Sequence, residues 1–365
     1  MVIQEIITHL ESFAPLAYQE SYDNSGLLVG HPLQQINKAL LTIDVTEAVI
    51  DEAIEHGCGL IIAHHPIIFK GMKRLNGYNE VERCLIKAIK NDIAIYAAHT
   101  NLDSVTGGVN SKIAEKLKLT NCGILSPAKE QLFKLVTFVP TESAEQVRRA
   151  MFDAGAGHIG HYDRCSYNGN GTGTFRANDG THPFVGNIGQ EHHEKETRIE
   201  TILPRHLKNK VVKALQNAHP YEEVAYDIYP LANEMPHVGI GMVGELAQPA
   251  DEKEFLAVIK KLFNCQVIKY TNLLGKKIQK VAVCGGSGSF LLADAIRAGA
   301  DIFITGDFKY HNYFDAEGKI LIADIGHFES EQFTKELFYE IVIKKFPTFA
   351  LRLSDVKTNP IFYFC

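Results

Sequence analysis

Short apolar segments of strand length alternate with helical patterns at both ends of this chain. In the N-terminal part, residues 59–63 (GLIIA) and 93–98 (IAIYAA) flank a stretch whose apolar residues recur at helical spacing. The C-terminal part repeats this rhythm, with strand-like segments at 280–284, 301–305 and 319–324. Continuous apolar strands are typical of parallel sheets covered on both faces, and strands that alternate with helices predict βαβ units. We therefore expect an α/β fold.

The two ends of the chain also resemble each other. Residues 53–65 (AIEHGCGLIIAHH) align without a gap with residues 295–307 (AIRAGADIFITGD). In both segments a helix end, a glycine turn and an apolar strand follow in the same order. Such units share a common pattern, so chance is one explanation. A duplication is the other, and it predicts two similar lobes with polar residues at equivalent strand ends.

The middle of the chain has a different pattern. Residues 131–232 read as strand, helix, strands, helix and strand, an order that suits a small α+β domain of ferredoxin-like type. Within them, residues 155–189 are rich in glycine and predict a surface loop. The 365 residues are too many for one ordinary core. We expect a split α/β domain with lobes at 1–130 and 233–365, and an inserted domain at 131–232.

Composition narrows the classes of function. The formal net charge is −6 and no long block of lysine or arginine offsets it, which argues against a nucleic-acid partner. Residues 1–15 read as an amphipathic helix rather than a secretory signal, and no apolar stretch approaches the ~20 residues that cross a bilayer. The seven cysteines are scattered without a C-x-x-C pair, which argues against a disulfide framework or a cysteine-rich zinc site. We expect a cytoplasmic protein without a membrane partner.

Five residues at strand and helix ends have the chemistry of metal ligands: His64, His65, Asp103, His327 and Glu331. His64 and His65 follow one buried strand and Asp103 follows the next, so their side chains should meet at one edge of the sheet. His327 and Glu331 are four residues apart at the start of a predicted long helix, which puts both on one face. Adjacent strand residues point to opposite faces, so the two histidines either serve two neighbouring ions or turn as the chain leaves the sheet.

These donors suit two divalent metal ions. Imidazole nitrogens beside carboxylate oxygens are typical of Zn, Mn or Fe sites. Glu331 has two oxygens and is the natural bridge between two ions ~3.5–4 Å apart. Three protein ligands per ion leave a position for water, as in catalytic rather than structural sites. His99 and His311 are candidates for proton transfer, because imidazole titrates near neutral pH.

Each motif alone also has a structural explanation. An isolated His-His pair is commonly a core feature, and an isolated H-x-x-x-E pattern is commonly a solvated helix pair. Residues 285–289 (GGSGS) could hold a phosphate on backbone N–H groups or form a tight turn. Residues 23–26 could form a turn or line the crevice. Asp307 and His311, just past a strand end, could orient metal-bound imidazoles.

Several segments carry a family resemblance. Residues 63–71 (AHHPIIFKG), 96–103 (YAAHTNLD) and 323–331 (ADIGHFESE) resemble the signature segments of the Nif-three-like dinuclear-metal family, whose members are widely labelled GTP cyclohydrolase 1 type 2 homologues. Residues 219–231 (HPYEEVAYDIYPL) resemble the PII/CutA-like domain that is inserted in the longer members.

This resemblance implies a ligand set and an assembly. One ion would be held by His65, Asp103 and Glu331, and the other by His64, His327 and the shared Glu331. The metal centres would face the internal cavity of a toroidal homohexamer, with trimers of the inserted domain capping its ends.

The resemblance also implies two hypotheses for function. The leading one is a metal-dependent hydrolase of GTP cyclohydrolase 1 type 2 kind, in which water attacks C8 of the purine, opens the imidazole ring and releases formate. GTP or another nucleotide would be its small-molecule substrate. The alternative is a non-catalytic, metal-containing hexamer in which the inserted domain senses an effector or binds a partner.

Overall fold

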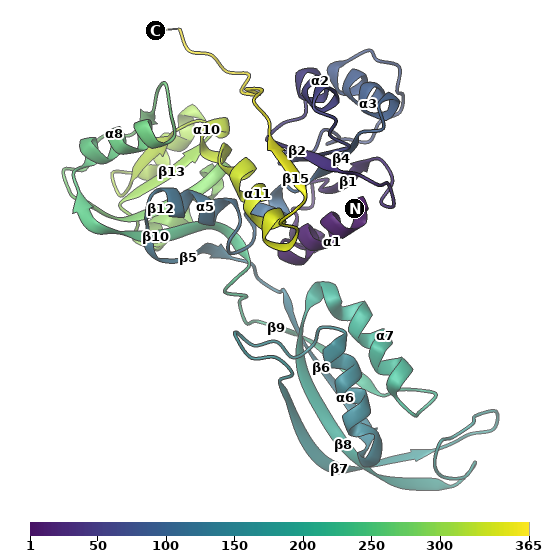
Figure 1. Ribbon diagram of the computed structural model, residues 1–365. Helices are drawn as coiled ribbons and strands as arrows, with labels where there is room; N and C mark the ends of the chain where they lie inside the picture. The colour runs from purple at the N-terminus through teal and green to yellow at the C-terminus, as the bar shows by residue number, and fades with distance from the viewer. Residues whose placement is uncertain (365) are drawn as a thin grey trace. The chain divides into compact units, whose positions relative to one another are not determined.

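Three β-sheets organise residues 1–364, the part of the chain that the computed structural model describes (Figure 1). A five-stranded and a six-stranded sheet belong to one unit, which consists of Met1–Pro127 and the chain from Pro236 onwards. The four-stranded sheet belongs to a second unit, Ala128–Met235. The chain passes from one unit to the other between residues 127 and 128 and between residues 235 and 236.

The five-stranded sheet is built around the predicted N-terminal strands. In spatial order its strands are β1 (Gly26–Val29), β4 (Ala94–Ala97), β3 (Leu60–Ala63), β2 (Lys38–Thr42) and β15 (Ala350–Leu353). The strands β2, β3 and β4 run parallel, and β3 and β4 are buried along their whole length, as their apolar sequences predict. Helices α2 (Glu47–Glu55) and α3 (Glu80–Lys90) cover one face, and α1 (Ile3–Phe13) covers the other. The Thr46 hydroxyl accepts a hydrogen bond from Val49 N–H and caps α2.

The six-stranded sheet contains a second parallel trio. Its spatial order is β11 (Lys269–Tyr270), β14 (Leu321–Asp324), β13 (Ile302–Gly306), β12 (Ile278–Ser287), β10 (Gly239–Ala250) and β5 (Thr120–Pro127). The strands β12, β13 and β14 run parallel. One face packs on α9 (Leu292–Arg297), and the other packs on α5 (Val109–Lys116), α8 (Glu252–Leu262) and α11 (Thr334–Lys345). The aligned segments 53–65 and 295–307 each supply the middle strand of a trio, β3 and β13.

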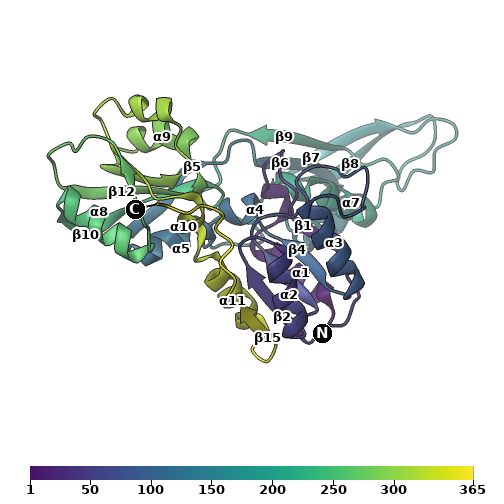
Figure 2. The same ribbon diagram turned by 90° about the horizontal axis from the view of Figure 1, so that it is seen from above.

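Each of the two sheets has an edge strand that comes from the opposite end of the chain. The C-terminal strand β15 pairs with β2, while β5 from the N-terminal part pairs with β10 (Figure 1). The sheets therefore do not correspond one to one to residues 1–130 and 233–365, as the expected lobes would. Each exchanged strand covers an edge that would otherwise leave backbone N–H and C=O groups unpaired. Figure 2 shows α5, α11 and the short helix α10 (His327–Glu331) between the two sheets, which share one continuous apolar core.

The second unit is an antiparallel sheet with helices on one face. Its strands lie in the order β7 (Ser166–Arg176), β8 (Glu191–Pro204), β6 (Leu132–Pro140) and β9 (Tyr226–Leu231). Helices α6 (Ala144–Asp153) and α7 (Lys208–Ala218) pack on alternate residues of the strands, such as Leu135, Val139 and Ile199. The surface loop expected at 155–189 is in part wrong, because β7 pairs with β8 along its whole length. The glycines of β7 are compatible with a strand because β7 lies at the edge of the sheet, where few side chains are needed for packing.

Within residues 1–364, no helix combines the length and the apolarity needed to cross a bilayer. The cysteines described there are free thiols: Cys58, Cys84, Cys122, Cys165, Cys265 and Cys284.

Candidate metal centre

The adjacent residues His64 and His65 diverge at the end of β3. The buried His64 ring donates from Nδ1 to the carbonyl oxygen of Ala98, which lies 3.0 Å away just beyond β4. The His65 ring donates from Nδ1 to Asp44 Oδ1, 2.7 Å away in the segment that follows β2. Because each Nδ1 carries the shared proton, each Nε2 has a lone pair that can bind a metal. Divergence of neighbouring strand residues therefore sends the two imidazoles to different partners.

Asp103 reaches the same edge of the sheet from the next strand. It ends the single helical turn α4 (Thr100–Asp103) that follows β4. Its Oδ1 atom lies 3.7 Å from His64 Nε2.

His327 and Glu331 come from the other sheet, on the short helix α10. The long helix expected here is wrong as a continuous element, because α10 ends before α11 begins. The i, i+4 spacing still brings His327 Nε2 within 3.2 Å of Glu331 Oε2. Asp307, just past β13, accepts a hydrogen bond from His327 Nδ1 at 2.7 Å.

Glu331 lies at the meeting point of the two sheets. Its Oε1 atom is 3.5 Å from His64 Nε2, and its Oε2 atom is 3.1 Å from His65 Nε2. Two groups that could each hold a metal ion share this carboxylate: His64, Asp103 and Glu331 form one, and His65, His327 and Glu331 form the other.

The structure groups the donors differently from the resemblance, which paired His65 with Asp103 and His64 with His327. The carbonyl of Ala98 fixes the His64 ring beside α4 and therefore beside Asp103. His65 is turned the other way, so that its Nε2 atom lies 3.3 Å from His327 Nε2.

The residues present fit a cation at both groups. His64 Nε2, Asp103 Oδ1 and Glu331 Oε2 are buried and, within the described residues, have no hydrogen-bond partner. Unpaired buried polar atoms cost free energy, and an ion in each group would satisfy them, because His64 Nε2 and Asp103 Oδ1 belong to one group and Glu331 Oε2 faces the histidines of the other. Three imidazole nitrogens with two carboxylates are a donor set that suits Zn, Mn or Fe.

The carboxylates and imidazoles perturb one another strongly. Burial disfavours a charged His65 ring, but Asp44 and Glu331 outweigh this and raise its pKa to about 9. Asp307 and Glu331 likewise raise the pKa of His327 to about 11 against the effect of burial. Burial and the nearby charge of Glu331 raise the pKa of Asp103 to about 7. Protons thus occupy this centre when metal does not, and the two compete.

Residues 285–289 do not form the expected tight turn: 285–287 end β12 with a register shift against β13, and a short 3-10 helix begins at Ser289. Gly286 has φ +61°, and a Cβ atom there would collide with Glu331 Oε1. Its N–H donates to Ser330 Oγ at 2.8 Å, and the N–H of Gly285 donates to Asn110 Oδ1 at 2.9 Å. These two amides are thus used within the protein, and the absence of a Cβ at Gly286 lets this end of β12 approach the shared carboxylate.

A cavity of about 580 Å³ adjoins both groups. Among the proton-transfer candidates, His99 lines this cavity, and its Nδ1 donates to Asp23 Oδ1 at 2.8 Å. His311 does not line it; the ring is exposed and packs against Tyr310. His311 is therefore not positioned to orient a ligand, whereas Asp307 is.

Sequence reasoning missed two groups that orient the imidazoles. Asp44 follows the strand β2, so the strand-end argument that found Asp103 could also have found it. The carbonyl of Ala98 gives no signal in side-chain chemistry. Asp23, in a segment that the sequence left open between a turn and the crevice, holds His99.

Comparison with known proteins decides the family. The family model Duf34/NIF3 (NGG1p interacting factor 3) matches residues 1–360. The chain belongs to the Duf34/NIF3 family. A relative from Halalkalibacterium halodurans, named GTP cyclohydrolase 1 type 2 homolog, is 46% identical over 327 residues, which cover 89% of this chain and 88% of the relative. A protein of the same name from Bacillus subtilis is 40% identical over 98% of this chain and 97% of its own length.

A solved structure supports the family's fold for this chain. The crystal structure of a Bacillus cereus protein related to NIF3 superposes with a TM-score of 0.83 and 40% identity, covering 100% of this chain and 99% of that one. This family member thus has candidate groups for metal binding at the junction of its two α/β sheets.

Proposed function

We propose that this chain is a dinuclear-metal-dependent hydrolase of GTP cyclohydrolase 1 type 2 kind, which opens the imidazole ring of GTP and releases formate. One observation carries the proposal: two groups of metal-binding side chains share the buried Glu331 beside a cavity of about 580 Å³. The names of the Halalkalibacterium and Bacillus relatives support the choice of GTP.

The two ions would be Zn, Fe or Mn. His64, Asp103 and Glu331 would hold one, and His65, His327 and Glu331 the other. When bound, such ions lower the pKa of water and polarise the group that it attacks.

The protein's own residues supply orientation and proton transfer. Asp44 and Asp307 hold the Nδ1 protons of His65 and His327, so that both Nε2 atoms point to the centre. Opening the ring adds one water across the C8–N9 bond, and release of formate from the resulting formamide consumes a second. Both steps move a proton at the substrate, and His99, held by Asp23 at the cavity wall, would transfer it at Nε2.

The test is formate release from GTP by the metal-loaded protein. Glu331→Gln keeps the shape of the side chain but removes its charge, so turnover should fall by roughly a hundredfold or more. Glu329→Gln, on the same helix but outside both groups, is the matched control and should retain turnover. Formate release at the wild-type rate by Glu331→Gln would contradict the proposal.

A second variant separates proton transfer from metal binding. His99→Gln should lose roughly 100-fold to 10,000-fold in turnover. His99 also lies with His64 and His65 in a third group that could hold a metal ion, so the metal content of the variant is measured beside its turnover. Unchanged turnover would remove His99 from the mechanism and leave the metal-binding assignment intact.

The second unit supports an alternative, non-catalytic function. It has its own cavity of about 640 Å³, which suits a sensor of small molecules. Its element order β6-α6-β7-β8-α7-β9 and its sheet order support the proposal that it is a ferredoxin-like domain of PII/CutA kind. If the metal-loaded protein turns over no nucleotide while this unit binds a ligand, the regulator hypothesis gains.

We also propose an oligomeric state and a cellular location for this chain. We propose a homohexamer from the family resemblance, and light scattering of the full chain tests it. The free cysteines support a reducing, cytoplasmic location, which fractionation of cells tests.

A further inference from the structure

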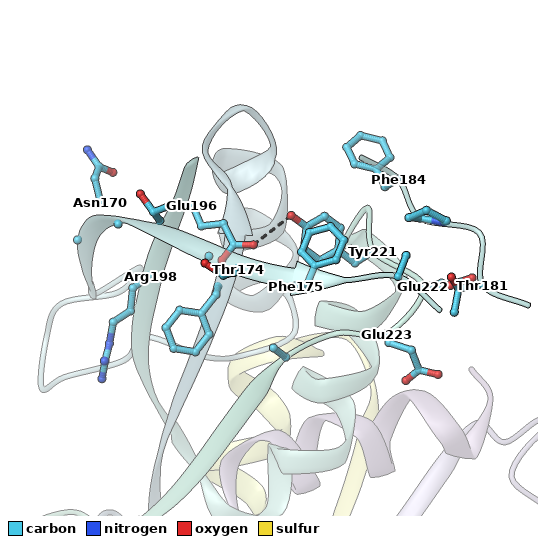
Figure 3. A pocket seen from close by; sticks show the side chains of 18 residues that line it. Asn170, Thr174, Phe175, Thr181, Phe184, Glu196, Arg198, Tyr221, Glu222 and Glu223 are labelled. Carbon is cyan, nitrogen blue, oxygen red and sulfur yellow. Dashed lines mark hydrogen bonds between the residues drawn. The ribbon is translucent and has the colours of Figure 1, made fainter. Parts of the chain in front are cut away.

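The cavity of the second unit lies against the sheet formed by β6, β7 and β8 (Figure 3). Phe138, Glu196 and Arg198 line it, and they alternate along their strands with the residues that pack on α6 and α7. The cavity therefore faces the side of the sheet that these helices leave open. The loop 219–225 between α7 and β9 and the loop 177–184 after β7 form its walls.

Aromatic rings surround this cavity. Phe175 and Tyr221 lie with their ring centres 5.9 Å apart, and Phe184 lies 6.4 Å from Tyr221 (Figure 3). Phe138 adds a ring from β6. The loop that carries Phe184 is held in place, because Glu222 Oε1 accepts a hydrogen bond from the N–H of His182 at 2.9 Å.

One carboxylate in this cavity has no opposite charge. Glu196 is 8% exposed, and its Oε1 atom accepts a hydrogen bond from the Tyr221 hydroxyl at 3.0 Å. Within residues 1–364 no lysine, arginine or histidine forms an ion pair with it. Arg198 pairs instead with Glu200 Oε1 at 3.0 Å and lies over the ring of Phe138.

The nearby His219 does not supply the missing charge. Its Nε2 donates to the carbonyl oxygen of Phe138, and its Nδ1 accepts from the N–H of Tyr221, which fixes a neutral tautomer. Burial also lowers the pKa of His219. A buried carboxylate that is hydrogen-bonded to one phenol but lacks a counter-charge costs free energy.

Glycine keeps the floor of the cavity open. A Cβ atom at Gly173 would collide with the carboxylate of Glu196, so glycine is required for that side chain to lie where it does. A Cβ atom at Gly171, directly across the strand pair from Glu196, would meet nothing within 4 Å. The space above Gly171 is thus unused by the protein itself.

We propose that this cavity binds a small organic cation, whose ammonium group lies against Glu196 and whose apolar body lies among Phe175, Phe184 and Tyr221. Aromatic faces attract cations, and a desolvated carboxylate strengthens that attraction. Glu222 and Glu223 at the rim add negative charge, while the charge of Arg198 is already engaged. An anionic nucleotide would meet carboxylates here and is disfavoured.

The test is calorimetric titration of the full chain with benzylammonium, beside its neutral analogue benzyl alcohol. Wild-type protein should bind benzylammonium at one saturable site per chain and benzyl alcohol roughly tenfold to a hundredfold more weakly. Glu196→Gln should weaken benzylammonium binding by a similar factor. Glu194→Gln, the next acid on the same face of β8 but outside the cavity, is the matched control and should bind as the wild type does.

Gly171→Leu tests the location without removing a charge. The backbone there is unstrained and the space is open, so the variant should fold, fill the cavity and abolish binding. Circular dichroism of each variant checks the fold. Equal affinity for the two probes, or binding unaffected by both Glu196→Gln and Gly171→Leu, would overturn the proposal. One further result would overturn the proposal: the wild-type protein binds neither probe, and light scattering shows that Gly171→Leu changes the number of copies in the assembly. The face would then be an interface between copies.

Discussion

Two buried carboxylates, one in each unit, are satisfied in different ways. Glu331 is 2% exposed and lies within 3.5 Å of the Nε2 atoms of three histidines. Glu196 is 8% exposed and meets one phenol among aromatic rings. Rigid nitrogen donors, each oriented from behind, suit a small divalent ion, whereas broad apolar rings suit a larger and weakly hydrated cation. These different environments are the reason that we propose a different kind of cation for each carboxylate.

Metal content should separate the two carboxylates most sharply. Glu331→Gln should weaken binding at both groups by roughly a hundredfold or more, because both use this side chain. Glu196→Gln should leave both ions bound. Elemental analysis after dialysis measures both variants, and loss of metal from Glu196→Gln would break the comparison.

Chelation should destabilise the unit that contains Glu331 and spare the other. A metal ion supplied at about 100 times its Kd stabilises the folded state by about 2.7 kcal/mol, which a chelator removes. Thermal unfolding with and without chelator tests this. Hydrogen exchange should show the loss of protection at β3 and α10 rather than at β8. A uniform loss across both units would contradict the expectation.

The grouping of the donors can be tested through the carboxylates behind the imidazoles. Asp44→Asn and Asp307→Asn should each lower the affinity for one ion by roughly tenfold to a hundredfold. Both act on the group of His65 and His327, so the double variant should lose one ion and keep the other. Asn is a suitable replacement at Asp307, whose φ of +58° it tolerates. Loss of both ions from the double variant would restore the pairing implied by the family resemblance.

The smallest expected effect is on stability in the second unit. Glu196→Gln removes an uncompensated buried charge but keeps an oxygen that can accept from Tyr221. The ligand-free variant should therefore gain about 1 kcal/mol in its free energy of unfolding. Urea denaturation measures this, with Glu194→Gln as the control. A loss of stability would mean that the charge already has a partner.

The sequence predicted the secondary-structure elements that depend on local patterns of apolar residues. The apolar runs at β3 and β4 predicted buried strands. The rule that the ends of neighbouring parallel strands meet at one edge of a sheet predicted that Asp103 lies near the two histidines. The break between α10 and α11 was missed because the apolar pattern continues across it.

Long-range contacts were the main features that the sequence did not reveal. The exchange of β5 and β15 depends on which sheet edge each strand meets, and local patterns do not encode that. The pairing of His64 with Asp103 depends on a backbone carbonyl, which has no side-chain signature. Glu196 is one of many glutamates in the sequence, and the glycines opposite it gained meaning only once the strand register was known.

The exchange of strands also has a consequence during synthesis. The residues of β2 and β3, with His64 and His65 after them, leave the ribosome long before β15, the strand that pairs with β2. Until then the edge of β2 is open, and His327 and Glu331, which complete the metal groups, are made only shortly before β15. Because chains fold from the N-terminus as they emerge, a nascent chain carries an incomplete centre until residues 327–331 have been made. Both candidate metal groups therefore wait for Glu331, which is made long after the histidines that follow β3.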